Sequence, residues 1–150
     1  MTTACLSTNA TNTFSLAAAP QVLHIATVSG VATLARGAAG TWSVSRHALD
    51  GDHISALHFD AATGTLLAAR IPGGLVRSTD GGESWQDSSP GVAEPSTYSL
   101  RGFAVGGKTV LYLGTEPVGL YRSEDGGQSW TDLAAVRTAP PRLPPSGMYT

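Results

Sequence analysis

The chain has 150 residues, enough for one ordinary domain with its own core. Only 13% of them are charged, and nine basic against eleven acidic side chains give a net charge of −2, so a nucleic-acid-binding surface is not expected. No apolar run approaches the roughly 18–20 residues that a membrane-spanning helix needs. The 18 glycines and 9 prolines favour a turn-rich β protein over a helical one.

The N-terminal region predicts a loose arm followed by short strands. Residues 1–13 are rich in Thr, Asn and Ser, and they lack the basic and apolar regions of a secretory signal, so we expect a flexible arm and a cytoplasmic protein. The single cysteine, Cys5, allows no intrachain disulfide and no cysteine-based metal site. From Gln21 onward, the runs QVLHIATVSG and VATLARGAAG are short and contain β-branched residues, which predicts strands.

The rest of the chain continues in short apolar runs punctuated by turn residues. HISALHFDA, residues 53–61, alternates apolar and polar side chains, whereas TLLAARI, residues 65–71, is continuously apolar and predicts a strand buried on both faces. After a Pro- and Ser-rich connector come YSLRGFAV, TVLYLGTE and GLYRS. The proline-rich residues 138–150 predict a tail. Because no segment keeps helical spacing over three turns, the pattern is all-β.

One octapeptide occurs twice, 45 residues apart. Residues 78–85 read STDGGESW and residues 123–130 read SEDGGQSW. The match extends upstream, where Pro72, Gly74, Leu75 and Arg77 correspond to Pro117, Gly119, Leu120 and Arg122. A period of 40–50 residues with about four strands per unit predicts the repeated sheets of a β-propeller. Trp42 lies 43 residues before Trp85 and is interpreted as a degenerate third copy that lacks the aspartate.

The residue types of the octapeptide fit a tight turn between two strands. The glycine pair supplies positive φ angles, and the aspartate accepts hydrogen bonds from backbone N–H groups of its own turn. The serine before the tryptophan does likewise more weakly, and the tryptophan begins the outer strand and closes the core. We therefore expect the tryptophan to dominate stability and the aspartate to set the register.

The octapeptide resembles the Asp box, S-x-D-x-G-x-[ST]-W, of the BNR-repeat β-propellers, and both copies match it at every position. The resemblance implies an all-β partial β-propeller of about three four-stranded blades, approximately 14–50, 51–92 and 93–137. Such a chain would be an open arc or a fragment of a six- to eight-bladed ring. The family includes sialidases, xyloglucanase-like hydrolases, sortilin-type receptor domains and photosystem-assembly-factor-like propellers, and its box lies at the blade periphery. The resemblance thus implies a structural role for Ser78, Asp80, Gly82, Ser84, Trp85, Ser123, Asp125, Gly127, Ser129 and Trp130.

In such a propeller, functional residues are expected on the loops that open onto the central face. These are the loops between the second and third strands of a blade and the connectors between blades. Their reactive side chains include Glu94 and Tyr98. The ligand-face candidates are Asp50, Asp52, His53, Arg70 and Glu116.

Two features resemble catalytic motifs. Arg70-Ile71-Pro72 matches the Arg-Ile-Pro motif with which sialidases hold the carboxylate of sialic acid. It lies just before Ser78 rather than tens of residues upstream, and Pro72 has its own counterpart in Pro117, so we interpret the match as coincidence. Asp50 and Asp52 flank one glycine, and with Glu116 opposite they resemble the carboxylate pair of a glycosidase. A solvated turn is the favoured interpretation.

The leading hypothesis is a non-catalytic binding or scaffolding module for a protein or a carbohydrate. The alternative is an incomplete glycoside hydrolase-like enzyme, exo-sialidase-like or xyloglucanase-like. His47, His53 and His58 lack the spacing of a metal site, so we predict no metal and no cofactor. Three blades cannot close a ring, which leaves two interpretations: a fragment of a longer propeller, which we favour, or copies that self-assemble head to tail.

Overall fold

The fold is given by a computed structural model that describes residues 3–6 and 18–138. The first sheet contains β1 (Thr3–Leu6), β2 (Val22–Thr27), β3 (Gly30–Arg36) and β4 (Trp42–Ala48). The middle sheet contains β5 (Ile54–Asp60), β6 (Thr65–Arg70), β7 (Gly74–Ser78) and β8 (Gln86–Asp87). The third sheet contains β9 (Ser96–Val105), β10 (Lys108–Glu116), β11 (Gly119–Ser123) and β12 (Thr131–Asp132), and the helix α1 (Ala135–Thr138) follows it.

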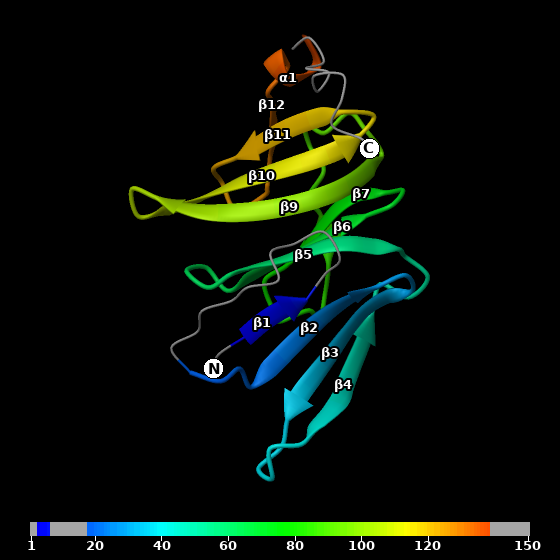
Figure 1. The fold of residues 1–150 in the computed structure, drawn as a ribbon, viewed down its shortest axis with the longest axis vertical. Helices are drawn as coiled ribbons and strands as arrows, with labels where there is room; N and C mark the ends of the chain where they lie inside the picture. The colour runs from blue at the N-terminus through cyan, green and yellow to red at the C-terminus, as the bar shows by residue number, and fades with distance from the viewer. Residues whose placement is uncertain (1–2, 7–17, 139–150) are drawn as a thin grey trace, which may run out of the picture.

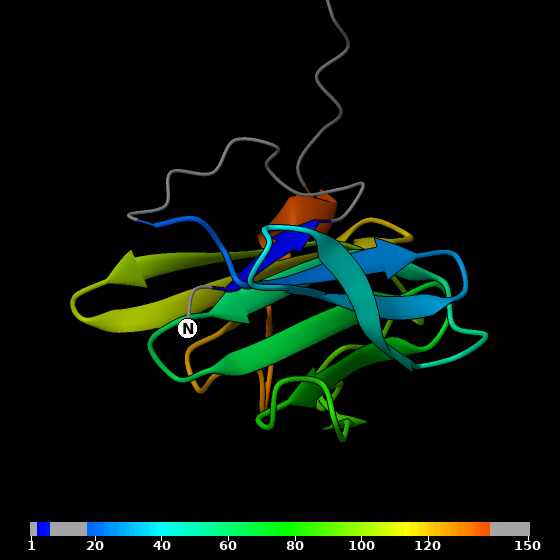
Figure 2. The same cartoon turned by 90° about the horizontal axis from the view of Figure 1, so that it is seen from below.

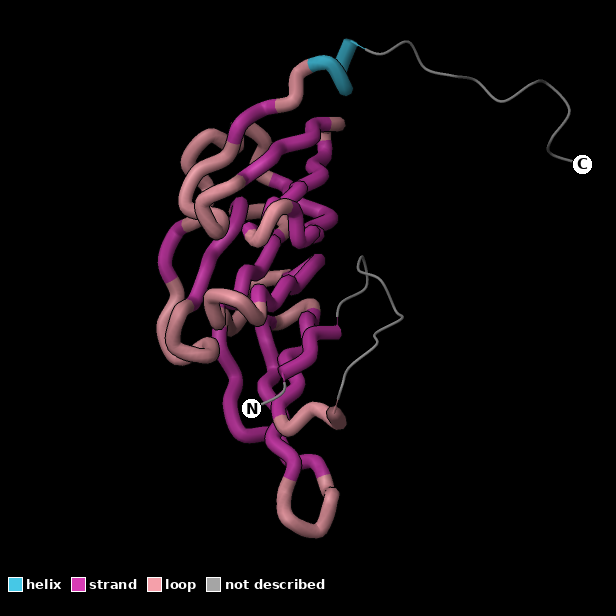
Figure 3. The backbone as a smooth tube through the Cα atoms, turned by 90° about the vertical axis from the view of Figure 1, so that its left-hand side faces the viewer, coloured by secondary structure: helices cyan, strands magenta, loops and turns pink. Residues whose placement is uncertain are grey.

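The three sheets are stacked along the long axis of the molecule. Figure 1 shows the first sheet at the bottom, the middle sheet above it and the third sheet at the top. The same succession is seen from the side in Figure 3, with α1 beyond the third sheet, and Figure 2 looks along the stack with the first sheet in front. Strands lie in sequence order within each sheet, and all neighbours are antiparallel except β1 and β2. The predicted all-β class is therefore confirmed.

The strand β1 differs from the sequence-based expectation. Residues 1–13 predict a loose arm, but Thr3–Leu6 pairs in parallel with the first part of β2. The backbone N–H and C=O groups on that edge of β2 need partners, and β1 supplies them. The remaining residues of the predicted arm lie outside the described part of the chain. The same holds for the predicted tail beyond Thr138, which is the last residue of α1.

The strand β6 is buried on both faces, as its continuous apolar sequence predicts. Every residue from Thr65 to Ala69 is buried. Because side chains alternate along a strand, Leu67 belongs to one hydrophobic cluster and Leu66 to another. The first cluster lies between the middle and third sheets and contains Ala56, Leu67, Ala69, Leu75, Leu100, Leu111, Leu113, Tyr121 and Trp130. The second lies between the first and middle sheets and contains Val31, Ile54, Leu57, Leu66, Ala68 and Val76.

The two octapeptides occupy the same place in the middle and third sheets. Each begins at the last residue of the third strand, Ser78 of β7 or Ser123 of β11, and ends just before the fourth strand. The strand pairing is equivalent as well, since Leu66 lies opposite Ser78 and Leu111 lies opposite Ser123. The sequence repeat is thus a repeat of hydrogen-bonded strands.

The three tryptophans differ in how far they are covered. Trp130 is 5% exposed, and its indole N–H donates to the backbone oxygen of Ser88 at 2.7 Å. Trp85 is half-buried against the cluster between the first and middle sheets, and its indole nitrogen finds no acceptor among the described residues. Trp42, at the start of β4, is 37% exposed. Of the three, Trp130 is therefore the most completely packed.

We expect Trp130→Ala to lower the free energy of unfolding by about 3–5 kcal/mol, because it removes a buried indole and leaves a cavity between two sheets. Trp42→Ala is the matched control and should cost clearly less, since Trp42 is 37% exposed and Trp130 only 5%. Equilibrium unfolding in urea, in dilute solution, measures both values. Equal costs for the two variants would show that the packing of Trp130 does not stabilise the stack.

Candidate functional site

The ends of the sheets differ in chemistry. One end carries the octapeptide turns, residues 78–85 and 123–130, and we call it the octapeptide end. The opposite end carries the β6–β7 and β10–β11 turns, together with the connectors that lead into β5 and β9, and we call it the connector end. The strand pairing requires this separation, because β7 starts opposite Arg70 and finishes opposite Leu66.

At the octapeptide end, both aspartates bind the backbone of their own turns. Oδ1 of Asp80 accepts hydrogen bonds from the backbone N–H groups of Glu83 and Ser84, both at 2.9 Å, and from the Ser78 hydroxyl at 2.7 Å. The Ser78 hydroxyl in turn accepts from the backbone N–H of Gly82 at 2.8 Å. These contacts hold the chain in a closed turn.

The second octapeptide turn repeats this geometry. Asp125 accepts from the backbone N–H groups of Gln128 at 2.8 Å and Ser129 at 3.0 Å, and from the Ser123 hydroxyl at 2.8 Å. Gly127 has a φ of +82°, and a Cβ there would lie 2.4 Å from Cδ2 of Leu67 in the middle sheet. Glycine is thus required both by the backbone conformation and by the approach of the neighbouring sheet.

The hydrogen bonds lower the pKa of both carboxyl groups. In Asp80, the bonds from Ser84 and Ser78 hold the pKa well below its usual range. In Asp125, partial burial alone would raise the pKa, but the bonds from Ser129, Ser123 and Gln128 outweigh it and lower the pKa to about 2. Both groups are therefore ionised at neutral pH with their oxygens engaged, so neither suits a general acid.

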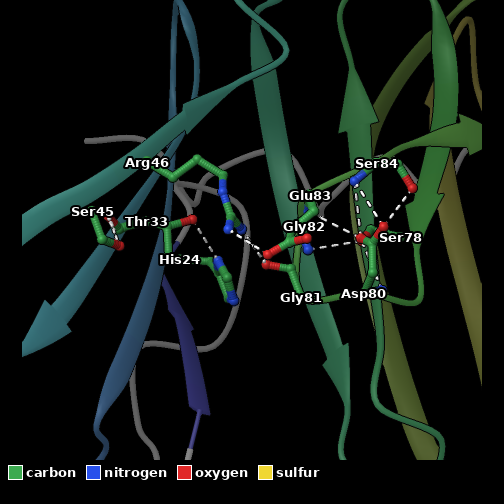
Figure 4. A network of polar contacts seen from close by, with 10 residues as sticks. All are labelled: His24, Thr33, Ser45, Arg46, Ser78, Asp80, Gly81, Gly82, Glu83 and Ser84. Atoms are coloured by element: carbon green, nitrogen blue, oxygen red, sulfur yellow. Dashed lines mark hydrogen bonds and ion pairs between the residues drawn. The ribbon is translucent and has the colours of Figure 1, made fainter.

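Polar contacts also join the octapeptide turn of the middle sheet, residues 78–85, to the first sheet (Figure 4). Arg46 of β4 donates to the backbone oxygen of Gly81 at 3.1 Å and forms an ion pair with Glu83 at 2.9 Å. Close by, Nδ1 of the buried His24 lies 3.0 Å from the hydroxyl of Thr33. Burial, with a smaller effect of Arg46, lowers the pKa of His24, so it is neutral at pH 7. The conspicuous polar groups here hold two sheets together.

At the connector end, Asp52 and Arg70 come together. Nη1 of Arg70 lies 3.3 Å from Oδ2 of Asp52, and Nη2 of Arg70 donates to the backbone oxygen of Gly73. The backbone N–H of Ile71 donates to the oxygen of His53 at 2.9 Å, which ties the β6–β7 turn to the connector before β5. Asp50 and His53 are exposed on the same connector. The structure thus brings four of the five ligand-face candidates to one place and pairs two of them.

A second polar cluster at this end consists of Glu94, Tyr121, Asp132 and Arg137. The Tyr121 hydroxyl donates to Oε2 of Glu94, and Nη2 of Arg137 lies 3.0 Å from Oε1 of Glu94 and 2.8 Å from the Tyr121 oxygen. The Arg137 guanidinium also lies 5.6 Å from the centre of the Tyr121 ring and pairs with Asp132. Because Tyr121 is completely buried, its hydroxyl is closed to a substrate.

Tyr121 and Arg137 were not among the candidates from the sequence. Tyr121 lies in GLYRS, which the sequence predicts only as one of its short apolar runs, and Arg137 lies after the last strand. One signal could have found Tyr121: in the 45-residue alignment it stands where the middle sheet has Val76. A polar aromatic at a position that the other copy fills with an aliphatic residue marks a place where one sheet departs from the repeat.

Backbone hydrogen bonds place the two clusters side by side. The N–H groups of Gly73 and Gly74 donate to the oxygen of Pro95 at 2.7 and 3.0 Å, and the Thr97 hydroxyl donates to the oxygen of Arg70 at 2.9 Å. The segment that carries Glu94 therefore runs beside the turn that carries Arg70. Glu116, the last residue of β10, is exposed and lies opposite Ser96 at the start of β9.

The resulting surface is acidic. Its carboxylates outnumber its cations, and both arginines already contact carboxylates. Tyr98 adds an exposed aromatic at the bulge of β9, 42% accessible. The acidic groups of this end are Asp50, Asp52, Glu94, Glu116 and Asp132, and its basic groups are Arg70 and Arg137.

The histidines do not form a metal site. Over residues 3–6 and 18–138, no three or more His, Cys, Asp or Glu side chains are grouped as metal ligands. His58 instead packs against β9, where a Cβ on Gly102 would lie 2.3 Å from its Nε2 atom. Burial lowers the pKa of His58, although Asp60 acts in the opposite direction. His58 is thus a packing residue.

The chain matches no protein-family model and no curated protein. Within the described ranges, no helix has the length and apolar character needed to cross a membrane.

We expect Ser129→Ala to raise the pKa of Asp125 towards its ordinary value of 3.8, because the variant removes a hydroxyl that donates to the ionised carboxylate. Since the folded-state pKa is the lower one, ionised Asp125 stabilises the fold fully above a pH of about 4, and this stabilisation is lost as the pH falls towards 2. Carboxyl-carbon NMR titration measures the shift. Ser84→Ala, which acts on Asp80, is the matched control, and an Asp125 pKa that moves equally in both variants contradicts the assignment.

Tyr121→Phe should lower the free energy of unfolding by about 1–3 kcal/mol, because it leaves the partly buried Glu94 without the hydroxyl that joins it to Arg137. Tyr112→Phe, which makes the same change on β10, should stay within about 0.5 kcal/mol of the wild type. Urea denaturation distinguishes the two. If Tyr121→Phe is neutral, the cluster does not hold the end of the chain in place.

Proposed function

We propose that the three sheets are consecutive blades of an Asp-box β-propeller and that the chain is a non-catalytic binding module with its ligand site at the connector end. Three features support this reading: the stacking of four-stranded sheets, the equivalent strand pairing of the two octapeptides, and the position of both at the end opposite the connectors. In such an arrangement the octapeptides maintain the fold, and residues that depart from the repeat are free to recognise a ligand.

One observation carries the non-catalytic reading. The two arginines at the connector end each form an ion pair with a carboxylate, Arg70 with Asp52 and Arg137 with Glu94. A glycosidase needs two carboxyl groups that reach the same substrate bond. The oxygens of Asp52 and Glu94 that contact the arginines are already engaged by them. These ion pairs instead hold the side chains of the surface in fixed positions, which favours the binding of a ligand over its hydrolysis.

The charge of this end indicates the chemistry of the ligand. Asp50, His53 and Glu116 are exposed and stand beside the paired groups. Carboxylates accept hydrogen bonds from sugar hydroxyls and attract ammonium groups, and they repel other carboxylates. A neutral carbohydrate or a basic protein segment therefore fits this surface better than an acidic glycan such as a sialoside.

A glycoside hydrolase-like activity is the second candidate. It is favoured by the gathering of Asp50, Asp52, Glu94 and Glu116 at one end of the sheets. Such an enzyme would have to use the exposed carboxylates, because the hydroxyl of Tyr121 is inaccessible. Hydrolysis assays on sialosides and β-glucans separate this candidate from the binding module.

The binding proposal is tested on an array of neutral oligosaccharides, sialylated oligosaccharides and Lys-rich peptides. We expect binding to neutral sugars or Lys-rich peptides, and a loss of at least about fivefold in affinity for Glu116→Gln. Glu124→Gln is the matched control at the octapeptide end and should bind as the wild type does. Binding confined to sialosides, or no binding at all, contradicts the proposal. A turnover that disappears in Glu116→Gln or Asp52→Asn would establish the hydrolase instead.

A further inference from the structure

The two interfaces inside the chain share one direction of packing. Trp130 of the third sheet packs towards the preceding sheet, where its indole donates to Ser88 and its backbone N–H donates to Pro90 at 2.9 Å. Trp85 of the middle sheet likewise packs towards the first sheet, in the cluster that contains Val31. Each sheet therefore has a tryptophan-bearing face, which points to the preceding sheet, and an accepting face, which points to the following one.

The tryptophan-bearing face of the first sheet has no sheet against it in the described part of the chain. Side chains alternate along each strand, so His24 and Thr33 point towards the middle sheet. The opposite face of the first sheet carries Leu34, Trp42 and Val44. Trp42 is 37% exposed and Val44 is 56% exposed. This face repeats the position that Trp85 and Trp130 have in the sheets that follow.

No further sheet packs on the accepting face of the third sheet in the described part of the chain, and only the short helix α1 lies beyond that sheet (Figure 3). In the middle sheet, Leu67 and Leu75 accept the third sheet, and their counterparts 45 residues later are Tyr112 and Leu120. Phe103 lies beside Tyr112 with the ring centres 5.9 Å apart and is 46% exposed. The half-buried Tyr112 and the exposed Phe103 thus form an aromatic pair on this face, with Tyr112 in the place of the buried Leu67.

We propose that two copies of this chain dock head to tail, with the Trp42 face of one copy on the Tyr112 face of the other. We choose a second copy as the occupant because each chain exposes one tryptophan-bearing face and one accepting face. Faces of these two types already pack against each other at both interfaces inside the chain. The contact is heterologous, since the two surfaces differ. The inference rests on the repeated packing of the sheets and is independent of the ligand proposed above.

The polar contacts of the two internal interfaces differ, whereas both interfaces contain an apolar cluster against which a tryptophan packs. One interface uses the bond from Trp130 to Ser88, and the other uses the bond from Arg46 to Gly81. Leu133, just after β12, and Val136, in α1, take the places that Ser88 and Gly91 have after β8 in the 45-residue alignment. A Cβ on Gly91 would lie 2.0 Å from the oxygen of Trp130, so Val136 prevents an equally close backbone approach. We therefore expect a looser, weaker contact than the internal ones.

Sedimentation velocity over a range of concentrations tests the proposal. The wild type should self-associate as its concentration rises, into dimers and larger head-to-tail assemblies, because each dimer keeps one free face of each kind. Trp42→Glu and Tyr112→Glu should each raise the dissociation constant at least about tenfold. Val28→Glu is the matched control, because Val28 is 72% exposed on the β2–β3 turn and lies off both faces. Near-ultraviolet circular dichroism confirms that each variant keeps the wild-type fold, and Phe103→Glu replaces Tyr112→Glu if the latter unfolds.

Mixing the variants distinguishes a head-to-tail contact from any symmetric one. Trp42→Glu retains an intact Tyr112 face, and Tyr112→Glu retains an intact Trp42 face, so an equimolar mixture should form a dimer that neither variant forms alone. A wild type that stays monomeric at all concentrations overturns the proposal, and so does a mixture that stays monomeric. If Val28→Glu dissociates the dimer as strongly as Trp42→Glu does, the proposed faces are not the interface.

Discussion

The structure depends on the middle sheet being apolar on both of its faces. Leu66 and Ala68 pack against the first sheet while Leu67 and Ala69 pack against the third, so one short strand supports two cores. A sheet that buried only one face would end the stack after two layers. The cost of this arrangement is that the outward faces of the first and third sheets retain apolar side chains, among them Val44 and Phe103.

Most of the polar side chains that look reactive in this chain maintain its fold. Asp80 and Asp125 close their own turns, and Arg46 joins the first sheet to the octapeptide turn of the middle sheet. Buried polar groups require partners, and in a protein with so few charged residues the available ones are used mainly for this purpose. The exposed acids at the connector end, Asp50 and Glu116, are therefore the informative exceptions.

The internal repeat is a guide to function because it separates shared from individual features. The serines and aspartates that open the two octapeptides make the same turn contacts in both sheets, which is expected of architecture. Tyr121 in place of Val76, and Leu133 in place of Ser88, change the chemistry of an otherwise equivalent position. The first change creates a polar cluster with Glu94 and Arg137, and the second alters the face on which a further sheet would pack.

The all-β class, the two-sided burial of residues 65–69 and the placement of the octapeptides between strands were predictable from the sequence, because each follows from local periodicity and from a motif repeated at constant spacing. The strand at Thr3–Leu6 was not predictable, since its pairing partner lies far along the chain and its own residues carry no strand pattern. The ion pair of Arg70 with Asp52 and the cluster of Tyr121, Glu94 and Arg137 were likewise decided by the tertiary structure. These contacts join residues 16 to 43 positions apart. Which side chains meet at the end of a sheet depends on the register and on how neighbouring sheets stack, and a single strand encodes neither.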